Sequence, residues 1–336
     1  MASVRLLRSD DLNPLRGLFL DFPCKAAQQR FQNIDPRALA AYFVGVANAH
    51  LGKGAAAGCA QWVGEDDKGA LAAFAALHRD EWHSRFYPLR CGRVAPFLTH
   101  LASGSLRSKM AEVVVGAARE DGLEHLAVRI DGSEYEPLRA LQTRGFYLVD
   151  CSPKFSARLL DVPRLPPPSS VRGTSIRDWR EEDLAPIQSI VSTSHPFNHY
   201  YNDPHLPREA TSRLFSGWVE KCCRQLAWKV FVLERRDRVC GFVIYLNPTA
   251  LNRALSTRLV VLDLVCLAEE MRGGGVGRWF IAETLRRLAA DFALVELRTS
   301  HNNLPAIACY ESLGMRTVSC DFILHWTEKG AGRTES

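Results

Sequence analysis

Residues 259–290 read LVVLDLVCLAEEMRGGGVGRWFIAETLRRLAA. The apolar run 259–267 predicts a β-strand, the glycine-rich stretch 272–277 predicts a turn, and residues 278–289 predict an amphipathic helix. A strand, a glycine turn and a helix N-terminus together form a cradle for phosphate, because free backbone N–H groups and the positive end of the helix dipole point at the anion. No Gly-Lys-Ser/Thr follows the glycines, so the turn is not a P-loop.

A second informative stretch follows closely and reads VELRTSHNNLPAIACYESLGM over residues 295–315. Its beginning predicts another strand, and residues 304–313 predict a helix. Ala306, Tyr310 and Leu313 fall on one face of that helix, and Gly314 stands where a helix C-cap belongs. The chain therefore repeats the order strand, turn and helix within sixty residues.

These two stretches resemble the GNAT family of N-acetyltransferases. The family's Arg/Gln-x-x-Gly-x-Gly/Ala motif is matched by Arg272, Gly275 and Gly277, and its Asn-x-x-Ala-Ile-x-x-Tyr-x-x-x-Gly motif by Asn303, Ala306, Ile307, Tyr310 and Gly314. The resemblance implies an α/β fold of tandem acyl-CoA N-acyltransferase domains, each with a mixed, mostly antiparallel central sheet flanked by helices. It also implies acetyl-CoA as the co-substrate.

Composition narrows the possible functions. The 336 residues are enough for two domains, and a net charge of +5 without a basic stripe speaks against a nucleic-acid binder. The ten cysteines show no C-x-x-C spacing, which favours a reducing cytoplasm over a disulfide framework or a zinc site. The absence of a long apolar segment predicts no membrane partner. The oligomeric state cannot be predicted.

The domain boundary is expected at the proline-rich stretch 161–173, because consecutive prolines form a stiff connector. On this basis residues 1–160 form a degenerate N-terminal GNAT-like domain, 174–328 the catalytic domain and 329–336 a flexible tail. Both halves end in strand, helix, glycine and strand, with Gly145 and Gly314 at equivalent places. The first half has no Arg-x-x-Gly-x-Gly sequence, so it is expected to be non-catalytic.

The cradle residues are expected to bind the pyrophosphate of acetyl-CoA, and they are Arg272, Gly273, Gly274, Gly275, Val276, Gly277 and Arg278. The resemblance assigns the pantetheine arm to the strand positions Val265 and Leu267, which would pair with its amides as an added strand does. Asn303 is expected to bond the pantetheine or to cap the helix that follows it; the two roles are compatible.

Tyr310 is the expected general acid, because a phenol with a pKa of about 10 stays protonated at neutral pH and matches a thiol leaving group. On spacing alone Tyr310 also fits a core aromatic residue, and the family motif favours catalysis. Asp263 is the candidate general base. Strand alternation places it on the face opposite Leu262 and Leu264, where it either accepts a proton or pairs with a neighbouring arginine.

The acceptor is expected to contact His199 and Tyr200 in a loop rich in histidine and tyrosine, with Tyr245 as a further candidate. The spacing of His195, His199 and His205 lacks a metal-ligand pattern, so no metal is expected. Residues 80–326 also resemble, loosely, the bacterial TDP-fucosamine acetyltransferases, which acetylate an amino sugar carried on a nucleotide. His83 and the pair His199–Tyr200 depart from that group's pattern.

The sequence therefore predicts an acetyl-CoA-dependent N-acetyltransferase that acts on the primary amine of a small molecule. A nucleotide-linked amino sugar is the acceptor that the second resemblance implies. Two alternatives stay open at this point. One is acetylation of a peptide or protein amine, and the other is a non-catalytic module that binds acetyl-CoA.

Overall fold

The computed structural model describes residues 2–22, 34–51, 58–194 and 197–328. The strands of the first half of the chain are β1 Ser3–Leu6, β2 Cys59–Glu65, β3 Leu71–Arg79, β4 Cys91–Leu98, β5 His125–Asp131 and β6 Tyr147–Arg158, and its helices are α1 Leu12–Leu20, α3 Pro36–Ala49, α4 Glu81–Ser84, α5 Gly104–Glu120 and α6 Tyr135–Gln142. The strands of the second half are β7 Thr174–Asp178, β8 Lys229–Arg235, β9 Arg238–Leu246, β10 Leu259–Leu267, β11 Leu294–Arg298 and β12 Arg316–Thr327, and its helices are α7 Leu184–Ser194, α8 His199–Asn202, α9 Arg208–Lys221, α10 Thr249–Leu255, α11 Val276–Leu288 and α12 Leu304–Ser312.

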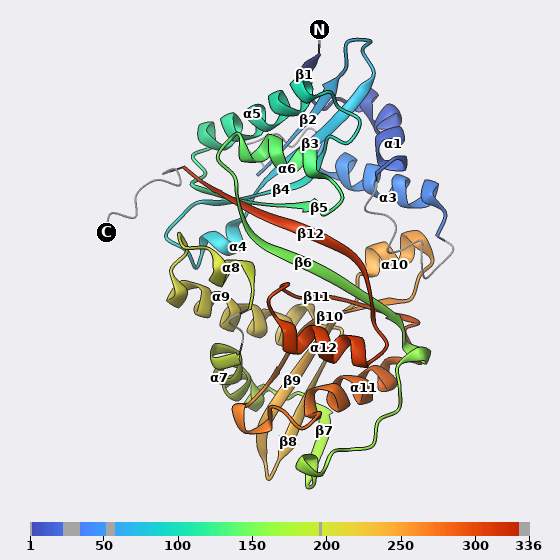
Figure 1. Ribbon diagram of the computed structural model, residues 1–336, viewed down its shortest axis with the longest axis vertical. Coiled ribbons are helices and arrows are strands. Elements are labelled where there is room, and N and C mark those ends of the chain that lie inside the picture. The colour runs from blue at the N-terminus through green and yellow to red at the C-terminus, as the bar shows by residue number, and fades with distance from the viewer. Residues whose placement is uncertain (1, 23–33, 52–57, 195–196, 329–336) are drawn as a thin grey trace.

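All twelve strands belong to one continuous sheet, in the order β1-β2-β3-β4-β5-β12-β6-β11-β10-β9-β8-β7. The two halves exchange their last strands: β6 pairs with β11 of the second half, and β12 pairs with β5 of the first half. The pairs β4–β5 and β10–β11 are parallel, whereas the other pairs are antiparallel. In Figure 1, β12 and β6 cross the middle of the molecule side by side and join its two ends.

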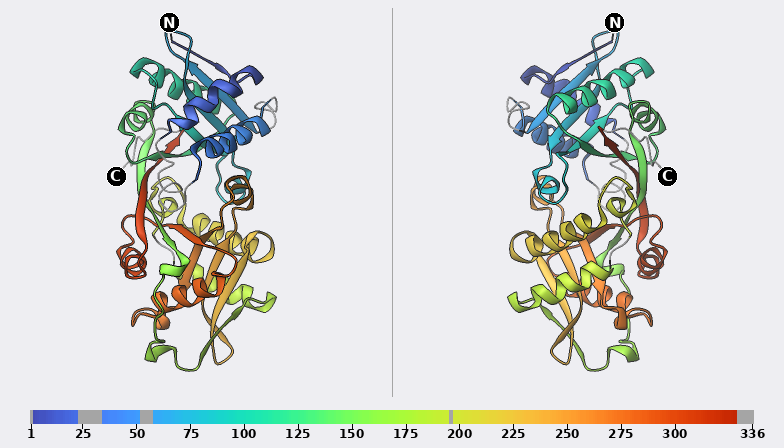
Figure 2. Two further views of the ribbon diagram at one scale, coloured as in Figure 1. Left: turned by 90° about the vertical axis from the view of Figure 1, so that its right-hand side faces the viewer. Right: turned by 90° about the vertical axis from the view of Figure 1, so that its left-hand side faces the viewer.

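Helices cover both faces of the sheet in the first half, because apolar side chains alternate along its strands. On β2, Trp62 packs in the cluster that includes α5, whereas its neighbour Val63 packs with α1 and α3. Figure 2 shows these helices on opposite sides of the strands. The core of this half therefore has two layers, one between the sheet and α5 and the other between the sheet and helices α1 and α3.

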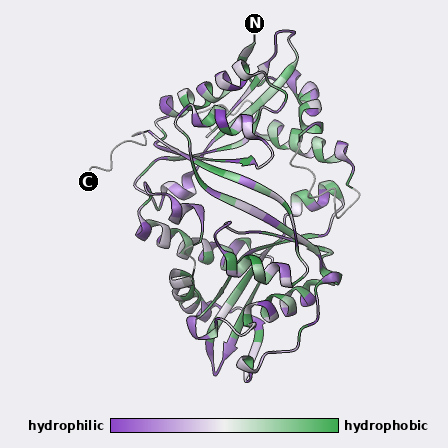
Figure 3. Cartoon of the chain, in the orientation of Figure 1, coloured by the Kyte–Doolittle hydropathy of each residue, from purple (hydrophilic) through white to green (hydrophobic). Residues whose placement is uncertain are grey.

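The second half is built in the same way. Val243 and Tyr245 of β9 pack in the cluster with α11, while Phe242 and Ile244 pack in the cluster with α7 and α9. Figure 3 shows the strands of this half as largely hydrophobic, and hydrophilic segments appear along the exchanged strands β6 and β12. Of these strands, β6 lines an internal space, described below, with Asp150, Ser152 and Lys154.

The architecture confirms the predicted fold class, a tandem α/β arrangement with mixed, mostly antiparallel pairing and flanking helices. The predicted domain boundaries 1–160, 161–173 and 174–328 stay a prediction, and the strand exchange carries β6 and β12 across them. The proposed tail 329–336 and His195 lie outside the described residues. Within the described residues, no helix combines the length and apolar character needed to cross a membrane.

Candidate active site

The candidate site lies where the parallel strands β10 and β11 separate. β10 and β11 are paired over Leu259–Val261, and beyond Val261 and Glu296 the described ladder stops although β10 runs on to Leu267. A cavity of about 1160 Å³ opens there, lined by residues from β10, β11, α8, α9, α12 and the glycine turn. Because β10 keeps its pairing with β9, its other edge leaves backbone groups available to a ligand in this cavity.

A β-bulge at Asp263 corrects one expectation about β10. Leu262 pairs with Tyr245 and Leu264 with Ile244, so Asp263 is an extra residue in the strand. As a result Leu262 packs on the α11 face and Leu264 on the α7/α9 face. Alternation does not continue through this point, and Asp263 is not opposite both leucines. The bulge turns Asp263 toward the cavity, which it lines.

The glycine turn has the conformation that a phosphate cradle needs. Gly273, Gly274 and Gly275 have φ values of 80°, 55° and 79°, a left-handed region that other residues rarely adopt. All three are exposed and line the cavity. A Cβ atom at Gly273 or Gly275 would meet nothing within 4 Å, so open space lies in front of the turn. The first turn of α11 adds N–H groups without intrahelical partners.

The other predicted cradle residues have different surroundings. Arg272 donates hydrogen bonds to the carbonyl oxygens of Leu267 and Thr193, and so ties the turn to the end of β10 and to α7. Arg278 and Gly277 line the cavity. Val276 is buried at 1% exposure in the core beneath the turn, so its side chain anchors the cradle and its backbone alone is available to a ligand.

Tyr310 and Asn303 lie where α12 borders the cavity. Tyr310 is 6% exposed, and its ring lies tilted against that of Phe155, with the centroids 5.6 Å apart. No described side chain is hydrogen-bonded to its hydroxyl, and burial raises its pKa well above the usual value. Asn303 caps α12 by accepting from Ala306 N at 3.4 Å and donates to Thr299 Oγ1 at 3.1 Å. The capping role expected for Asn303 is therefore present.

Asp263 accepts a hydrogen bond of 2.7 Å from the indole Nε1 of Trp218 on α9. Burial raises the pKa of this carboxyl, and the hydrogen bond from Trp218 opposes the rise. Pairing with an arginine, the alternative considered for Asp263, is not seen among the described residues. A carboxyl group with a raised pKa that lines a cavity is suited to exchange a proton with a molecule bound there.

His199 ends a hydrogen-bonded chain that the sequence did not predict. His325 Nδ1 lies 2.5 Å from Asp203 Oδ2, and His325 Nε2 lies 3.0 Å from His199 Nδ1. Burial opposes ionisation of Asp203, but the hydrogen bonds from His125 and His325 outweigh it and hold the pKa of the carboxyl well below its usual range. Tyr147 also donates to Asp203. These groups come from β5, β12, β6 and the end of α8.

The ionised carboxylate fixes the tautomers along this chain. Since a carboxylate only accepts hydrogen bonds, His325 donates from Nδ1 and accepts at Nε2. His199 must then donate from Nδ1, which leaves its Nε2 with a lone pair. His199 lines the cavity, so a neutral imidazole nitrogen is available there. That His199 contacts the acceptor stays a prediction.

Tyr200 contacts a histidine from the first half of the chain, and this histidine in turn lies next to a carboxylate. Its hydroxyl lies 2.6 Å from His83 Nε2, and His83 Nδ1 lies 2.7 Å from Asp80 Oδ2. Tyr200 and His83 both line the cavity. The two halves therefore build this wall of the cavity together, with His199 and Tyr200 from α8 and His83 from α4.

Tyr245, the third residue predicted to contact the acceptor, lies elsewhere. It is fully buried, and its hydroxyl lies 2.8 Å from Thr284 Oγ1 on α11. It does not line the cavity. The reason is the alternation along β9, which points residue 245 into the α11 core. Tyr245 is a core residue with a satisfied hydroxyl, and the sequence-based assignment is corrected.

In the first half, the positions that correspond to the glycine turn and to Tyr310 are occupied by the protein's own side chains. The helix that follows β4 begins at Ser103, whose side chain accepts from Leu106 N and satisfies the helix start from within. Arg107 donates to the carbonyl oxygens of Thr99 and Ala102 in the same turn. Four residues before Gly145, where Tyr310 stands before Gly314, the first half has the fully buried Leu141.

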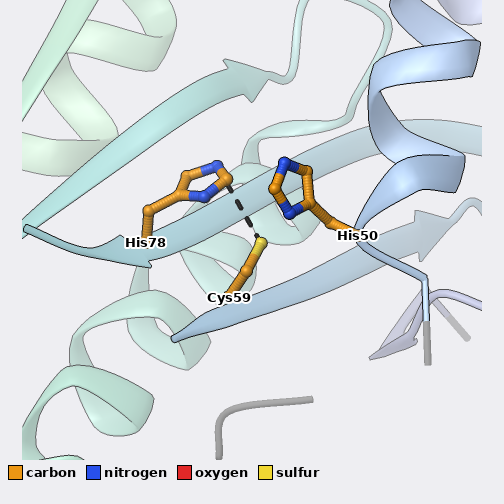
Figure 4. Close-up of side chains that lie close together, drawn as sticks. All are labelled: His50, Cys59 and His78. Carbon is orange, nitrogen blue, oxygen red and sulfur yellow. Dashed lines mark hydrogen bonds between the residues drawn. The ribbon is translucent and has the colours of Figure 1, made fainter. Parts of the chain in front are cut away.

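Two groups of side chains bring three possible metal ligands together. Figure 4 shows the first, in which His50 at the end of α3 approaches Cys59 and His78, a cross-strand pair on β2 and β3. His78 Nε2, 3.9 Å from Cys59 Sγ, also lies 3.0 Å from the carbonyl oxygen of Ala95. A nitrogen that donates to a carbonyl is protonated and does not ligate a metal.

The second group consists of His125, Asp203 and His325. The 2.5 Å contact between His325 and Asp203 is a hydrogen bond, and both ring nitrogens of His325 are already in use. Each group therefore has at least one ligand nitrogen engaged in a hydrogen bond in this arrangement. The expectation of no metal stays a prediction.

Residues 189–315 match the acetyltransferase (GNAT) family. This stretch of the chain is therefore similar to a GNAT domain. The match covers the residues that form the cradle, the β10 bulge and the α12 tyrosine. The matched stretch thus contains the features on which the sequence resemblance was based, and the co-substrate of GNAT acetyltransferases in general is acetyl-CoA.

The fold of the whole chain is similar to solved GNAT structures. A GCN5-related N-acetyltransferase from Sphaerobacter thermophilus superposes with a TM-score of 0.64 at 14% identity, covering 97% of this chain and 95% of that one. A tandem GNAT protein from the clavulanic acid biosynthesis pathway gives a TM-score of 0.54 at 16% identity over the full length of both chains. At these identities the likeness concerns the fold. No curated protein sequence matches the chain significantly.

Proposed function

We propose that the chain is an acetyl-CoA-dependent N-acetyltransferase that moves an acetyl group to the primary amine of a small acceptor by direct attack on the thioester. The observation that carries the proposal is the single cavity that runs from the glycine turn, along the parted strands β10 and β11, to Tyr310 and His199. The GNAT match over residues 189–315 supports it.

The residues present fit acetyl-CoA, which supplies an activated acetyl group when bound. Gly273, Gly274 and Gly275 with the first turn of α11 would hold its pyrophosphate on backbone N–H groups. The edge of β10 that faces away from β9 would pair, at Val265 and Leu267, with the amides of the pantetheine arm. Arg278 faces the same cavity and adds positive charge near the phosphates.

Two side chains are proposed to transfer protons during the reaction. Tyr310 keeps its hydroxyl protonated, because its pKa is raised by burial, and it is placed to donate that proton. Asp263, whose pKa is also raised, is placed to accept one from the acceptor ammonium directly or through water. The first half would be a degenerate copy, since Ser103, Arg107 and Leu141 occupy the places of the cradle and of Tyr310.

The test is to incubate the protein with acetyl-CoA and a panel of amines and to detect acetylated products by mass spectrometry. The panel includes nucleotide-linked amino sugars, free amino sugars, polyamines and short peptides. Product from a small amine supports the proposal, and product from a nucleotide-linked amino sugar alone identifies that acceptor class. Product from peptides only would replace the small-molecule acceptor with a peptide. Binding of acetyl-CoA without any product would make the chain a non-catalytic binding module.

A further inference from the structure

Arg129 stands at the wall that the first half contributes to the cavity. It lies on β5, opposite Ile323 of β12, which in turn lies opposite Asp150 of β6. Arg129 lines the main cavity and also a smaller one of about 310 Å³, and His199 and Tyr200 line both cavities too. Its side chain stays accessible because it faces this internal space rather than the packed core.

The neighbouring charges on this wall are matched with one another. Lys154 lies 3.1 Å from Glu296, and Arg298 pairs with Asp321. Asp150 accepts hydrogen bonds from Ser300 Oγ at 2.7 Å and from His301 Nδ1 at 3.0 Å. Among the residues that the structure describes, by contrast, no carboxylate lies within ion-pair distance of Arg129 and no acceptor is hydrogen-bonded to it.

The guanidinium of Arg129 is exposed to the solvent-filled cavity and stays charged. Enclosure and the positive charge of Arg298 lower its pKa, whereas the negative charges of Asp321 and Asp150 raise it. Since neither carboxylate forms an ion pair with Arg129, its N–H donors are open to an anion that enters the cavity. Its planar fork of N–H donors fits the two oxygens of a carboxylate or phosphate. The cavity brings such an anion within reach, because Arg129 opens onto the space that leads to His199 and to Asp263.

We infer that Arg129 binds an anionic group of the acceptor, so that the substrate is an amine that also carries a carboxylate or a phosphate. The inference rests on the proposed function and adds the substrate class. Carboxylate and phosphate share the oxygen pair that the guanidinium recognises. The acceptor is thereby oriented with its anionic end on the β5 wall and its amine toward the parted strands β10 and β11.

Anion binding is measured directly by calorimetry on protein saturated with CoA, so that the cradle is already occupied. Inorganic phosphate and acetate are titrated separately at constant ionic strength, and they distinguish the two sources of oxyanion. The variants are Arg129→Gln and, as a matched control, Arg139→Gln on the exposed face of α6, where the arginine pairs with Glu136. Thermal unfolding establishes that both variants are folded.

Wild type and Arg139→Gln are expected to bind at least one anion at millimolar concentration, and Arg129→Gln to bind it at least about tenfold more weakly, as loss of a charged hydrogen bond predicts. The same anion affinity in Arg129→Gln, or no anion binding by wild type, would overturn the inference. If Arg129→Gln does not fold, Arg129→Lys is used in its place, because lysine keeps the positive charge but lacks the planar pair of N–H donors. Unchanged affinity of Arg129→Lys for both anions would also overturn the inference.

Acceptor pairs that differ only in the anionic group provide the second readout. Glycine is compared with glycinamide, and glucosamine 6-phosphate with glucosamine, and the ratio of kcat/KM within each pair is recorded. Arg129→Gln is expected to lower the preference for the anionic member at least about tenfold, mainly through KM. A wild type that prefers the neutral member of both pairs refutes the inference about Arg129 while leaving acetyl transfer intact.

Failure of the proposed function has a different signature. A protein that does not bind acetyl-CoA in the same calorimeter refutes the proposed function, and the anion titrations are then run without cofactor. Because the Gly turn is also an anion site, those titrations compare wild type with Arg129→Gln, and the difference between them still reports on Arg129.

Discussion

His325 donates a hydrogen bond from Nδ1 to Oδ2 of Asp203 over 2.5 Å, and neither side chain is exposed to solvent. The pair joins β12, the last strand of the chain, to the end of α8, and it fixes the tautomer of His199 at the cavity wall. A buried charge of this kind is tolerated because three side chains donate to it. The contact therefore serves both the fold and the site.

Stability should fall when the pH drops from 6.5 toward 4. Burial lowers the pKa of His325 from 6.5 to about 4, so in this window the unfolded chain binds a proton that the folded chain does not. The free energy of unfolding then decreases by at most about 1.4 kcal/mol per pH unit for this histidine. The pKa of His199 is lowered too and adds to the slope. Asp203 stays ionised throughout.

Urea unfolding at several pH values between 7.5 and 4 measures this slope. His325→Gln keeps a donor toward Asp203 but cannot titrate, so its stability should depend less on pH than that of the wild type. Equal slopes for the two proteins would show that His325 keeps its ordinary pKa in the folded state.

Tyr310→Phe should lower kcat by ~10²–10⁴, since general acid catalysis contributes about that much. The affinity for acetyl-CoA should change little, because the ring still packs against Phe155 and no described side chain bonds the hydroxyl. Rates with saturating acceptor and calorimetric affinities separate the two effects. An unchanged kcat would remove Tyr310 from the mechanism.

Gly277→Glu should abolish acetyl-CoA binding, because it places a carboxylate and its bulk in the first turn of α11. A Cβ at this position meets Leu267 Cδ1 at 3.6 Å, an ordinary contact, so the fold should tolerate the change. The matched control is Gly104→Glu at the start of α5, where a Cβ meets nothing within 4 Å. The control should bind acetyl-CoA normally, because the proposed function places the cofactor site in the second half of the chain and not at α5. Undiminished binding by Gly277→Glu would mean that the cradle is misassigned.

Trp218→Phe should shift the acid side of the activity profile to higher pH. The indole N–H of Trp218 favours the ionised form of Asp263, so its loss raises the pKa of the carboxyl further. If Asp263 must be ionised to act, activity is then lost at a higher pH as the solution is acidified. The pH dependence of kcat/KM measures this shift. In Asp263→Asn, the fall of kcat/KM at acidic pH that is due to this carboxyl is expected to disappear. A limb at the same pH in wild type and Trp218→Phe would exclude Asp263 as the base.

Gly217→Ala should destabilise the contact between the halves by about 1–3 kcal/mol, as overpacking does. A Cβ on Gly217 of α9 would lie 2.5 Å from Cζ of Phe86, which belongs to the first half. Thermal unfolding with Gly116→Ala on α5 as the control, where a Cβ has open space, measures the cost. A stability equal to that of the control would show that Phe86 moves freely.

The features that sequence analysis predicted correctly are local. Gly273–Gly275, the cap at Asn303 and the helix with Tyr310 are encoded within short windows, where glycine, a capping amide and helical spacing carry their own signal. The fold class followed from the same motifs. The structure added that Arg107 and Ser103 close the equivalent turn in the first half.

The features that sequence analysis missed depend on distant residues. The bulge at Asp263 is set by the register against β9, and the burial of Tyr245 by its partner Thr284, so neither is visible in a single strand. Arg129 lies almost two hundred residues before Ile323, its neighbour on β12. A histidine in an ordinary strand, such as His325, gave no signal of its contact with Asp203.

The exchange of β6 and β12 has a consequence for how the protein is made. β5 is synthesised well before its native neighbour β12, which follows it in the chain by about 190 residues. At about 5–20 residues per second, the nascent first half waits roughly 10–40 seconds with an open edge. During that time β6 is the adjacent strand that is already available, and its native place beside β11 does not yet exist. The sheet is therefore completed only once β12 has been made, and a ribosome that stalls before residue 316 releases a chain in which β5 and β6 both lack their native neighbour β12.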